Sequence, residues 1–263
     1  MIPLKFGLWW SGKNMSYLRY LTFKSLRHFH PNSEIMLMVS DKYSNNHQWN
    51  VEKQDFENND IKTDYLDKVQ DLGVKVIKGT FFEQFAPNFA SDLYRWWFLY
   101  NFGGFYLDTD QIILKSFESL PLNNDFIYSG YNVPSCGYYT PVGVIGASKQ
   151  SDIVKAMHEN VANQIDVNNY NSAGPFLLKR VLEAKKWTEA MFNAPSSYFY
   201  PVPESFMMHL VYDGRFCISN NSYSLHWFGG LPLSQEFNLK YTEEFAKTSN
   251  ECISVFLREN KII

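Results

Sequence analysis

The sequence predicts an α/β fold in which a Rossmann-like sheet is flanked by helices, and three observations support this prediction. Residues 4–10 form a near-continuous apolar run, residues 15–30 have apolar positions at helical spacing, and residues 35–39 are a second apolar run. A strand, a helix and a strand in this order make a βαβ unit with two parallel strands and a right-handed crossover. Because ligands gather at the carboxyl ends of such strands, the loop at residues 9–14 is a candidate site for a nucleotide base.

The remaining elements are predicted from apolar runs and from the residues that interrupt them. Residues 41–70 are polar and charged, and we expect a loop there with a short helix around residues 64–72. The stretches at 130–142 and 195–205 are rich in proline and small residues and are predicted to be loops. We expect further strands at 74–77, 112–114, 126–129, 143–147 and 223–227, a short apolar segment at 206–211, and helices at 151–165, 171–186 and 236–263.

Residues 91–114 are the most informative segment of the sequence, because they predict a helix followed by a buried strand. Ser91 is a good residue for the N-cap of a helix, and Gly103 and Gly104 are of the type at which helices commonly end. A helix of strong apolar character is therefore predicted between them. The short apolar run at residues 105–107 then predicts a buried strand.

Two carboxylates, Asp108 and Asp110, follow this strand on either side of Thr109. Alternation along an extended chain places both on the same side. Buried carboxylates without partners are costly, and like charges this close need a cation beside them. Mg²⁺ or Mn²⁺ suits oxygen ligands and keeps coordination positions free for phosphates. The pair therefore indicates a metal–diphosphate site, and the alternative is a polar turn in which Asp108 caps the chain and Asp110 is solvated.

The composition excludes several classes of protein. Hydrophobic residues make up 45% of the 263 residues and aromatic residues 17%, which is enough material for a large core. The net charge is −3, whereas proteins that bind nucleic acids or membrane surfaces in general have an excess of basic residues. The three cysteines, Cys136, Cys217 and Cys252, argue against a disulfide framework and a zinc site. No apolar run is long enough for a signal sequence or a membrane span, so we expect a cytoplasmic protein.

The helix before the carboxylates carries a charged pair, Asp92 and Arg95, whose spacing of three places both on one face. The combined pattern resembles the sugar-binding region of glycosyltransferases with a DXD motif. That family includes capsular, lipopolysaccharide and mannosyl transferases and the catalytic domains of the large clostridial glucosylating toxins. The pattern reads Asp92-x-x-Arg95, an apolar run, and Gly103-Gly104-x-Tyr106-x-Asp108-x-Asp110, with a looser match at Ile2, Pro3, Lys5 and Trp9–Trp10.

The resemblance implies a glycosyltransferase-A type fold, with a Rossmann-like mixed sheet flanked by helices, in a single domain that covers residues 1–263. Residues 1–115 would bind the nucleotide sugar, and residues 116–263 would form the acceptor side with a C-terminal helix. The implied reaction is a metal-dependent, retaining transfer of a sugar from a nucleotide-diphosphate sugar to a saccharide or other hydroxyl acceptor. A UDP-sugar is the favoured donor, and Mn²⁺ (or Mg²⁺) is the implied cofactor.

The resemblance also implies roles for the residues of the motif. Asp110 would bind the metal directly, and Asp108 would link the metal, through water, to the ribose hydroxyls. Asp92 and Arg95 would hold hydroxyls of the donor sugar and the ribose, and Arg95 would also offset the charge of the diphosphate. Asp108, Asp110 and Arg95 are therefore the predicted catalytic residues.

Four residues outside the motif are implied in donor or metal binding. Trp10 ends the first strand and would lie near the donor, although core packing is the alternative. Gly174 stands in an Ala-Gly-Pro sequence where the family often has Thr-Gly-Pro, and a helix start alone also explains this sequence. His226 would contact the diphosphate or complete the metal site, since imidazole is a good ligand for Mn²⁺. Trp227 would pack beside it and contact the donor.

Two other functions remain open. A metal-dependent phosphoesterase would need further Asp, His or Asn ligands at strand ends, and these are not apparent in the sequence. A non-catalytic nucleotide-sugar-binding subunit is disfavoured by the intact motif. The acceptor is also open between a saccharide, a protein side chain and a modified nucleic-acid base, and the charge balance gives no support to the last of these.

Overall fold

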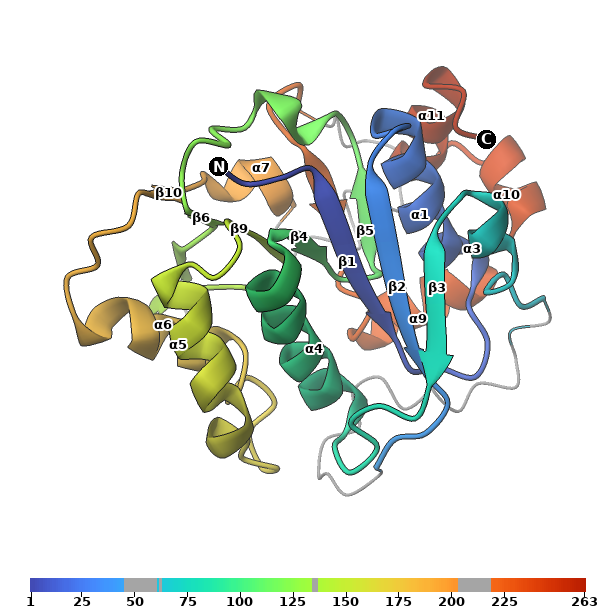
Figure 1. Ribbon diagram of the computed structural model, residues 1–263. Helices are drawn as coiled ribbons and strands as arrows, with labels where there is room; N and C mark the ends of the chain where they lie inside the picture. The colour runs from blue at the N-terminus through green and yellow to red at the C-terminus, as the bar shows by residue number, and fades with distance from the viewer. Residues whose placement is uncertain (45–60, 62, 134–136, 203–218) are drawn as a thin grey trace.

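The computed structural model describes residues 1–44, 61, 63–133, 137–202 and 219–263, which form a mixed α/β structure (Figure 1). At its centre lies a seven-stranded sheet. Its strands are β1 (Lys5–Trp10), β2 (Glu34–Ser40), β3 (Lys75–Gly79), β4 (Gly104–Leu107), β6 (Phe126–Tyr128), β9 (Val144–Ala147) and β10 (Met191–Asn193), arranged in the order β10-β6-β9-β4-β1-β2-β3.

The sheet combines parallel and antiparallel pairs, as the predicted fold class requires. β1 is parallel to both β2 and β4, and β2 is parallel to β3. β9 runs antiparallel to its two neighbours, β4 and β6. The carboxyl ends of β1 and β4 therefore lie side by side at one edge of the sheet, which is where the predicted site residues follow.

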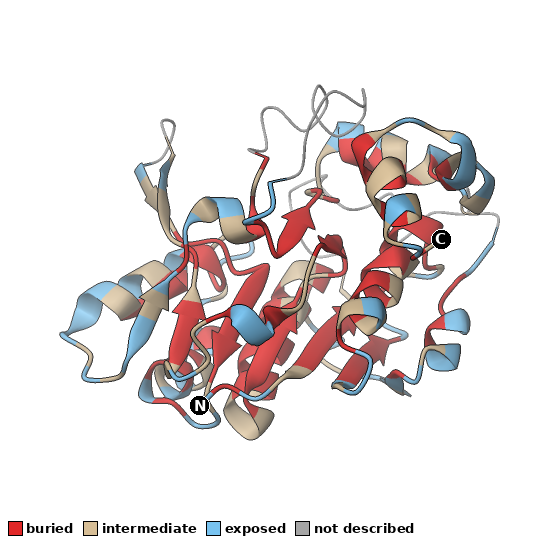
Figure 2. Ribbon diagram, turned by 90° about the horizontal axis from the view of Figure 1, so that it is seen from above, coloured by how far each residue is buried: buried red, intermediate tan, exposed pale blue. Residues whose placement is uncertain are grey.

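Helices cover both faces of the sheet, and Figure 2 shows that its central strands are buried. The edge strands β3 and β10 are partly exposed. Phe6, Leu8 and Trp10 of β1 belong to one core cluster, which includes residues of the first helix, whereas Trp9 belongs to a second cluster with the long fourth helix. This is the alternation expected of a strand buried on both faces. The helices are α1 (Tyr17–Phe29), α3 (Lys68–Asp71), α4 (Pro87–Phe102), α5 (Asp152–Asn160), α6 (Pro175–Ala184), α7 (Ser196–Phe199), α9 (Pro232–Lys240), α10 (Glu243–Thr248) and α11 (Cys252–Glu259), with 3-10 turns η1 (Phe117–Ser119) and η2 (Val161–Gln164).

A small second sheet brings the C-terminal part of the chain to the edge of the central sheet. Its strands, β5 (Gln111–Ile113) and β11 (Ser224–His226), are antiparallel, and His226 pairs with Gln111. A third core cluster joins this ribbon to α1 and to the C-terminal helices. As a result, the end of β11 lies beside the turn that follows β4. Within the described residues, no helix has both the length and the apolar character needed to cross a membrane.

The prediction that Ser91 caps a helix is wrong. Helix α4 begins at Pro87, with Ala86 at its N-cap, and Ser91 lies inside the helix. Proline is favourable at the first helical position because it has no N–H group that would need a partner there. The Ser91 hydroxyl is instead 2.7 Å from the Tyr106 hydroxyl, so it ties the helix to β4.

Other differences concern the second half of the chain. A loop was predicted at 130–142, but β7 (Tyr131–Val133) and β8 (Gly137–Tyr139) form an antiparallel hairpin in which Tyr131 pairs with Tyr139. Helix α6 begins at Pro175 rather than at residue 171. Strand β10 was not predicted, α7 lies in a predicted loop, and the helical tail is divided into α9, α10 and α11. The apolar segment predicted at 206–211 lies outside the described residues.

Candidate active site

The turn between β4 and β5 carries Asp108 and Asp110 at the edge of the central sheet. The Asp108 N–H group donates to the Gly143 carbonyl at 2.9 Å, and the Trp227 N–H group donates to the Asp110 carbonyl at 3.0 Å. The turn is thus held on one side by the chain entering β9 and on the other by the chain leaving β11. These backbone contacts set the position of both carboxylates.

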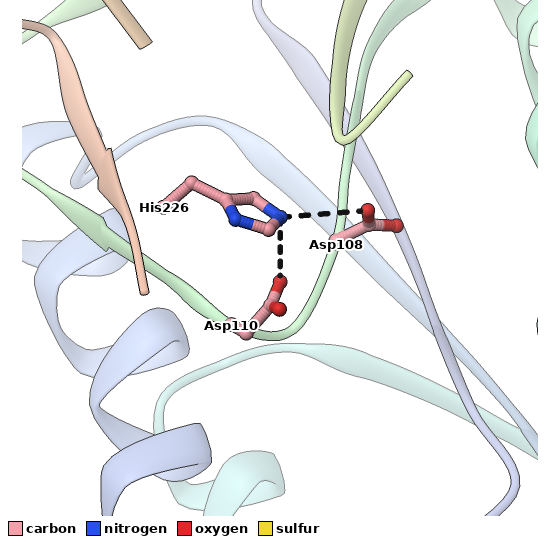
Figure 3. A group of neighbouring side chains, drawn as sticks. All are labelled: Asp108, Asp110 and His226. Atoms are coloured by element: carbon pink, nitrogen blue, oxygen red, sulfur yellow. Dashed lines mark ion pairs between the residues drawn. The ribbon is translucent and has the colours of Figure 1, made fainter. Parts of the chain in front are cut away.

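Asp108, Asp110 and His226 direct polar atoms into one small space (Figure 3). His226 Nε2 lies 3.2 Å from an Asp110 oxygen and 3.9 Å from an Asp108 oxygen. One potential ligand atom from each residue lies within 4.8 Å of the others. The side chains of Asp110 and His226 are 12% and 11% exposed and that of Asp108 is 29% exposed, so the cluster is most accessible at Asp108.

The two carboxylate oxygens of Asp110 differ in their partners. Oδ2 accepts a hydrogen bond from the Gly229 N–H group at 2.7 Å. Oδ1, which faces His226 Nε2, is buried and accepts no hydrogen bond from the described residues. An unsatisfied buried acceptor is costly, and coordination of a cation would remove that cost. Two carboxylates and one imidazole are a donor set that suits Mn²⁺, so these residues fit the implied ion.

The His226 ring is oriented by the residues that follow β11. The Phe228 N–H group donates to His226 Nδ1 at 3.1 Å, so the ring proton lies on Nε2, which faces the carboxylates. Coordination of a metal through Nε2 would require this proton to be lost or to move to Nδ1. Phe228 has a φ of 49°, a left-handed conformation that is uncommon for a bulky residue and marks local strain next to the cluster. Burial alone would lower the pKa of His226, but Asp110 and Asp108 outweigh it and raise the pKa above its ordinary value. The two carboxylates therefore favour a proton on His226 Nε2.

Arg95 connects α4 to the turn. Its guanidinium donates to Asp92 through Nη1 and to Asp108 Oδ1 through Nη2, the latter at 3.0 Å. The guanidinium also lies over the ring of Tyr106, 4.3 Å from its centre. Arg95 and Asp92 are buried, and Arg95 Nε has no hydrogen-bond partner among the described residues. One arginine thus holds two carboxylates from different elements.

Asp92 and Asp108, the two carboxylates that Arg95 contacts, have pKa values shifted in opposite directions. Burial raises the pKa of Asp92 to about 6, although the contact with Arg95 opposes this shift. Burial would also raise the pKa of Asp108, but Arg95 and then His226 outweigh it and hold the pKa well below its usual range. At neutral pH both groups are ionised, and Asp92 is the one that protonates first on mild acidification.

Two glycines leave space against these carboxylates. A Cβ atom at Gly143 would lie 2.9 Å from Asp108 Oδ2 and 3.1 Å from His226 Nε2. A Cβ atom at Gly174 would lie 2.8 Å from Asp92 Oδ1. All three distances are shorter than normal van der Waals contacts of a Cβ atom. A side chain at either glycine would therefore displace a charged group of the cluster.

We expect Gly143→Ala to weaken Mn²⁺ binding by about 10–100-fold, the range typical of changes around a metal ligand. The added methyl group would displace the Asp108 carboxylate and the His226 ring, which supply the atoms nearest to it. Titration calorimetry with Mn²⁺ measures the affinity, and thermal unfolding shows whether the fold is retained. If the folded variant binds Mn²⁺ with wild-type affinity, the space beside Gly143 is not needed for metal binding.

The predicted donor residues outside the motif lie in two places. Gly174 is next to Asp92, as described above. Trp10 and Trp227 are buried, and the Arg19 guanidinium lies 5.1 Å from the ring centre of each. Arg19 Nη1 donates to the Thr109 hydroxyl at 2.9 Å, so this buried cation from α1 reaches the turn itself.

Sequence reasoning missed Arg19 and Gly143. Arg19 stands among the apolar positions of a predicted helix, and nothing in its local sequence distinguishes it from a surface arginine. Gly143 precedes a predicted strand, where a small residue is unremarkable. Both are recognised only from their distance to residues far away in the chain.

Comparison with known proteins finds one family model that matches part of the chain. Residues 18–127 match the family model described as "Glycosyltransferase sugar-binding region containing DXD motif". No curated protein sequence matches the chain. Among solved structures, the apo-form glycosyltransferase GlyE from Streptococcus pneumoniae TIGR4 matches with a TM-score of 0.50 and 13% identity, over 98% of this chain and 64% of that chain. The PaToxG glycosyltransferase matches with a TM-score of 0.49 and 21% identity, over 70% and 69%. The galactosyltransferase LgtC, in complex with donor and acceptor sugar analogues, matches with a TM-score of 0.45 and 16% identity, over 92% and 99%.

Proposed function

We propose that this chain, whose residues 18–127 match the model of a glycosyltransferase sugar-binding region with a DXD motif, is a metal-dependent, retaining glycosyltransferase. The donor would be a nucleotide-diphosphate sugar, with a UDP-sugar favoured, and the acceptor a saccharide or another hydroxyl compound. The observation that carries this proposal is the cluster of Asp108, Asp110 and His226, in which a buried carboxylate oxygen has no donor. A purely structural role gives no reason to keep that oxygen unsatisfied.

Asp108, Asp110 and His226 would hold Mn²⁺ or Mg²⁺ at the end of β4. When bound, the ion would supply Lewis-acid stabilisation of the charge on the departing diphosphate. Asp110, tied to Gly229 by its other oxygen, is the most firmly held ligand. Asp108 is the most exposed of the three, which suits a second contact with the ribose hydroxyls through water.

Arg95 and Asp92 would orient the donor. Arg95 already contacts Asp92 and Asp108, and its cation lowers the cost of bringing an anionic diphosphate beside two carboxylates. Asp92 accepts hydrogen bonds when ionised and so can hold sugar hydroxyls. Gly174 itself places no side chain against Asp92, where a Cβ atom would lie 2.8 Å from Oδ1. These features support a donor sugar bound between α4 and the start of α6.

Trp10 and Trp227 would contribute to the donor site by holding Arg19 in place. Both rings are buried and pack on the Arg19 guanidinium, which in turn contacts Thr109 between the two metal ligands. Their predicted contact with the donor stays a proposal. In this arrangement, residues 1–115 provide most of the donor site and residues 116–263 provide His226 and the acceptor side.

The other functions make different predictions about the site. A phosphoesterase with two metal ions needs more ligands, and within the part of the chain that the structure describes Asp108, Asp110 and His226 form the one cluster with metal-ligand geometry. A binding-only subunit would retain the same cluster without turnover. A protein side chain or a modified nucleic-acid base remains an alternative acceptor.

Incubation with UDP-glucose, UDP-galactose, UDP-N-acetylhexosamines and GDP-mannose in the presence of Mn²⁺ tests the proposal. We expect metal-dependent release of the nucleoside diphosphate from at least one donor, removed by EDTA and restored by Mn²⁺. Cleavage of simple phosphoesters without sugar preference would favour the phosphoesterase. Donor binding with no turnover for any donor would favour the binding subunit.

We expect Mn²⁺ affinity to fall as the pH is lowered through the neutral range, by about tenfold for each pH unit below the pKa of His226. A proton on Nε2 competes with the metal, and because the two aspartates raise this pKa above 6.5, the competition begins at a higher pH than for an ordinary histidine. Calorimetric titrations at pH 6, 7 and 8 measure the effect. His226→Asn, which has no titrating ring, should bind more weakly at pH 8 and show a flatter pH dependence. A pH-independent affinity in the wild type would exclude His226 as a ligand.

A further inference from the structure

A cavity lies beside helix α6, apart from the metal-binding cluster. It has a volume of about 260 Å³ and is lined by Tyr138 and Tyr139 of β8 and by four residues of α6, namely Phe176, Lys179, Arg180 and Glu183. None of the carboxylates of the candidate active site lines it. Small-molecule sites typically have volumes of about 300–1,000 Å³, so this cavity accommodates only a small group, such as one ring of a larger ligand.

The lining of this cavity combines aromatic faces with charged groups. Phe176 is 36% exposed, although large apolar side chains are usually covered. The side chains of Lys179 and Glu183 make no hydrogen bond or ion pair with any other described residue, although they are one helical turn apart. Arg180 donates to Gln164 at 2.9 Å, and its guanidinium has further donors. The cavity therefore offers flat apolar rings, cationic side chains with free hydrogen-bond donors, and a carboxylate that can accept hydrogen bonds.

This mixture discriminates between classes of ligand. A purely apolar ligand would leave Lys179 and Glu183 desolvated, which is costly. A polyanion would meet Glu183 among the two cations. A sugar ring has C–H groups on its faces and hydroxyls around its edge, so it can lie on an aromatic face while its hydroxyls bond to charged side chains. Because a hydroxyl both donates and accepts, it satisfies Lys179 and Glu183 alike.

Both elements that line the cavity also reach the donor site. Phe176 follows Gly174 by two residues, a reach of at most about 7 Å, and Gly174 lies against Asp92. Tyr139 precedes Gly143 by four residues, a reach of at most about 14 Å, and Gly143 lies against Asp108 and His226. The Thr140 hydroxyl donates to the Pro175 carbonyl at 2.7 Å, which joins the two elements between the cavity and the carboxylates. A ligand in the cavity is thus within a few sugar rings of the proposed donor.

We propose that this cavity is a subsite for the acceptor, and that it binds one ring of an acceptor saccharide on Phe176 and Tyr139, with hydroxyls on Lys179 and Glu183. This proposal rests on the proposed glycosyltransferase function and adds to it a place where a saccharide acceptor binds. It also separates acceptor binding, on β8 and α6, from donor binding, on α4 and the turn after β4.

Binding of the full chain to an array of immobilised neutral and acidic oligosaccharides tests the proposal. We expect the wild type to bind at least one of them, and Phe176→Ala and Lys179→Ala each to weaken that binding by about tenfold, a typical effect of losing one aromatic or charged contact. Leu233→Ala, which removes an exposed apolar residue from α9, is the matched control and should bind as the wild type does. Thermal unfolding verifies that each variant is folded.

Hydrolysis of UDP-sugars in the presence of Mn²⁺ is measured without acceptor on the same wild-type sample. It distinguishes failure of the acceptor subsite from failure of the proposed glycosyltransferase function. Donor hydrolysis with no saccharide bound, or with binding that survives in both folded variants, would overturn the subsite and leave the proposed function intact. Absence of hydrolysis for every donor, with saccharide binding lost in Phe176→Ala and Lys179→Ala, would overturn the proposed function and retain a saccharide site.

Discussion

Asp110→Asn should lower metal-dependent donor turnover by about 10²–10³-fold in kcat, the size of effect seen when charge stabilisation is removed from an active site. The substitution is nearly isosteric. The amide oxygen can still accept from Gly229 N–H, so the tether to the loop after β11 is kept. The change is then confined to the oxygen that faces His226 Nε2, where an NH₂ group would repel a cation.

Steady-state kinetics with the best donor and calorimetric titration with Mn²⁺ measure the effect. Asp110→Ala should lose the same activity and, because it also loses the contact with Gly229, should in addition unfold at a lower temperature. Asp67→Asn neutralises an exposed carboxylate on the surface and is the control for the loss of one charge. Near-native turnover in Asp110→Asn would show that the metal site is assigned to the wrong residues.

Arg95→Met should destabilise the protein by about 3–5 kcal/mol at pH 8, the typical cost of removing one partner of a buried ion pair. Arg95 is 3% exposed and contacts both Asp92 and Asp108, so its loss leaves two carboxylates without their shared cation. Urea unfolding measures the change in the free energy of unfolding. Donor turnover should fall as well, since the same guanidinium is proposed to offset the diphosphate charge.

The pH dependence of this effect identifies its cause. Burial already raises the pKa of Asp92 to about 6 with Arg95 in place, and without Arg95 the pKa should rise further. A carboxyl group whose pKa is raised by folding favours the folded state when protonated, and this contribution is lost as the pH rises through the pKa of the folded state. Arg95→Met should therefore be less destabilised at pH 5 than at pH 8, and Asp92→Asn combined with Arg95→Met should recover part of the loss at pH 8. An equal loss of stability at both pH values would mean that packing, rather than unpaired charge, dominates.

Arg95→Lys separates charge from geometry. Lysine keeps the positive charge but lacks the planar fork that reaches Asp92 and Asp108 together. We expect it to be more stable than Arg95→Met and still impaired in donor use. Full activity in Arg95→Lys would show that a positive charge suffices at this position.

The family and the fold were predictable because their signals are local. Apolar runs alternate with helical periodicity from residue 4 onwards, and strands buried on both faces need such runs. The mixed sheet is confirmed, and residues 18–127 match the model of the family that the motif resembles. The error at Ser91 has a local cause too, because a good N-cap residue was preferred to Pro87, which starts the helix one turn earlier. The hairpin of β7 and β8 was missed because its pairing between aromatic residues is not visible in a segment rich in proline and glycine.

The sequence by itself determined the α/β order of elements and the placement of Asp108 and Asp110 on one side of a strand end, since spacing along the chain decides both. Only the tertiary structure decided that His226 faces them, that Arg95 holds Asp92 and Asp108 at once, and that Gly143 and Gly174 keep the space beside them open. The physical reason is that a charged cluster depends on distances between segments far apart in the chain, and those distances are set by the packing of β11 and β9 against the turn after β4.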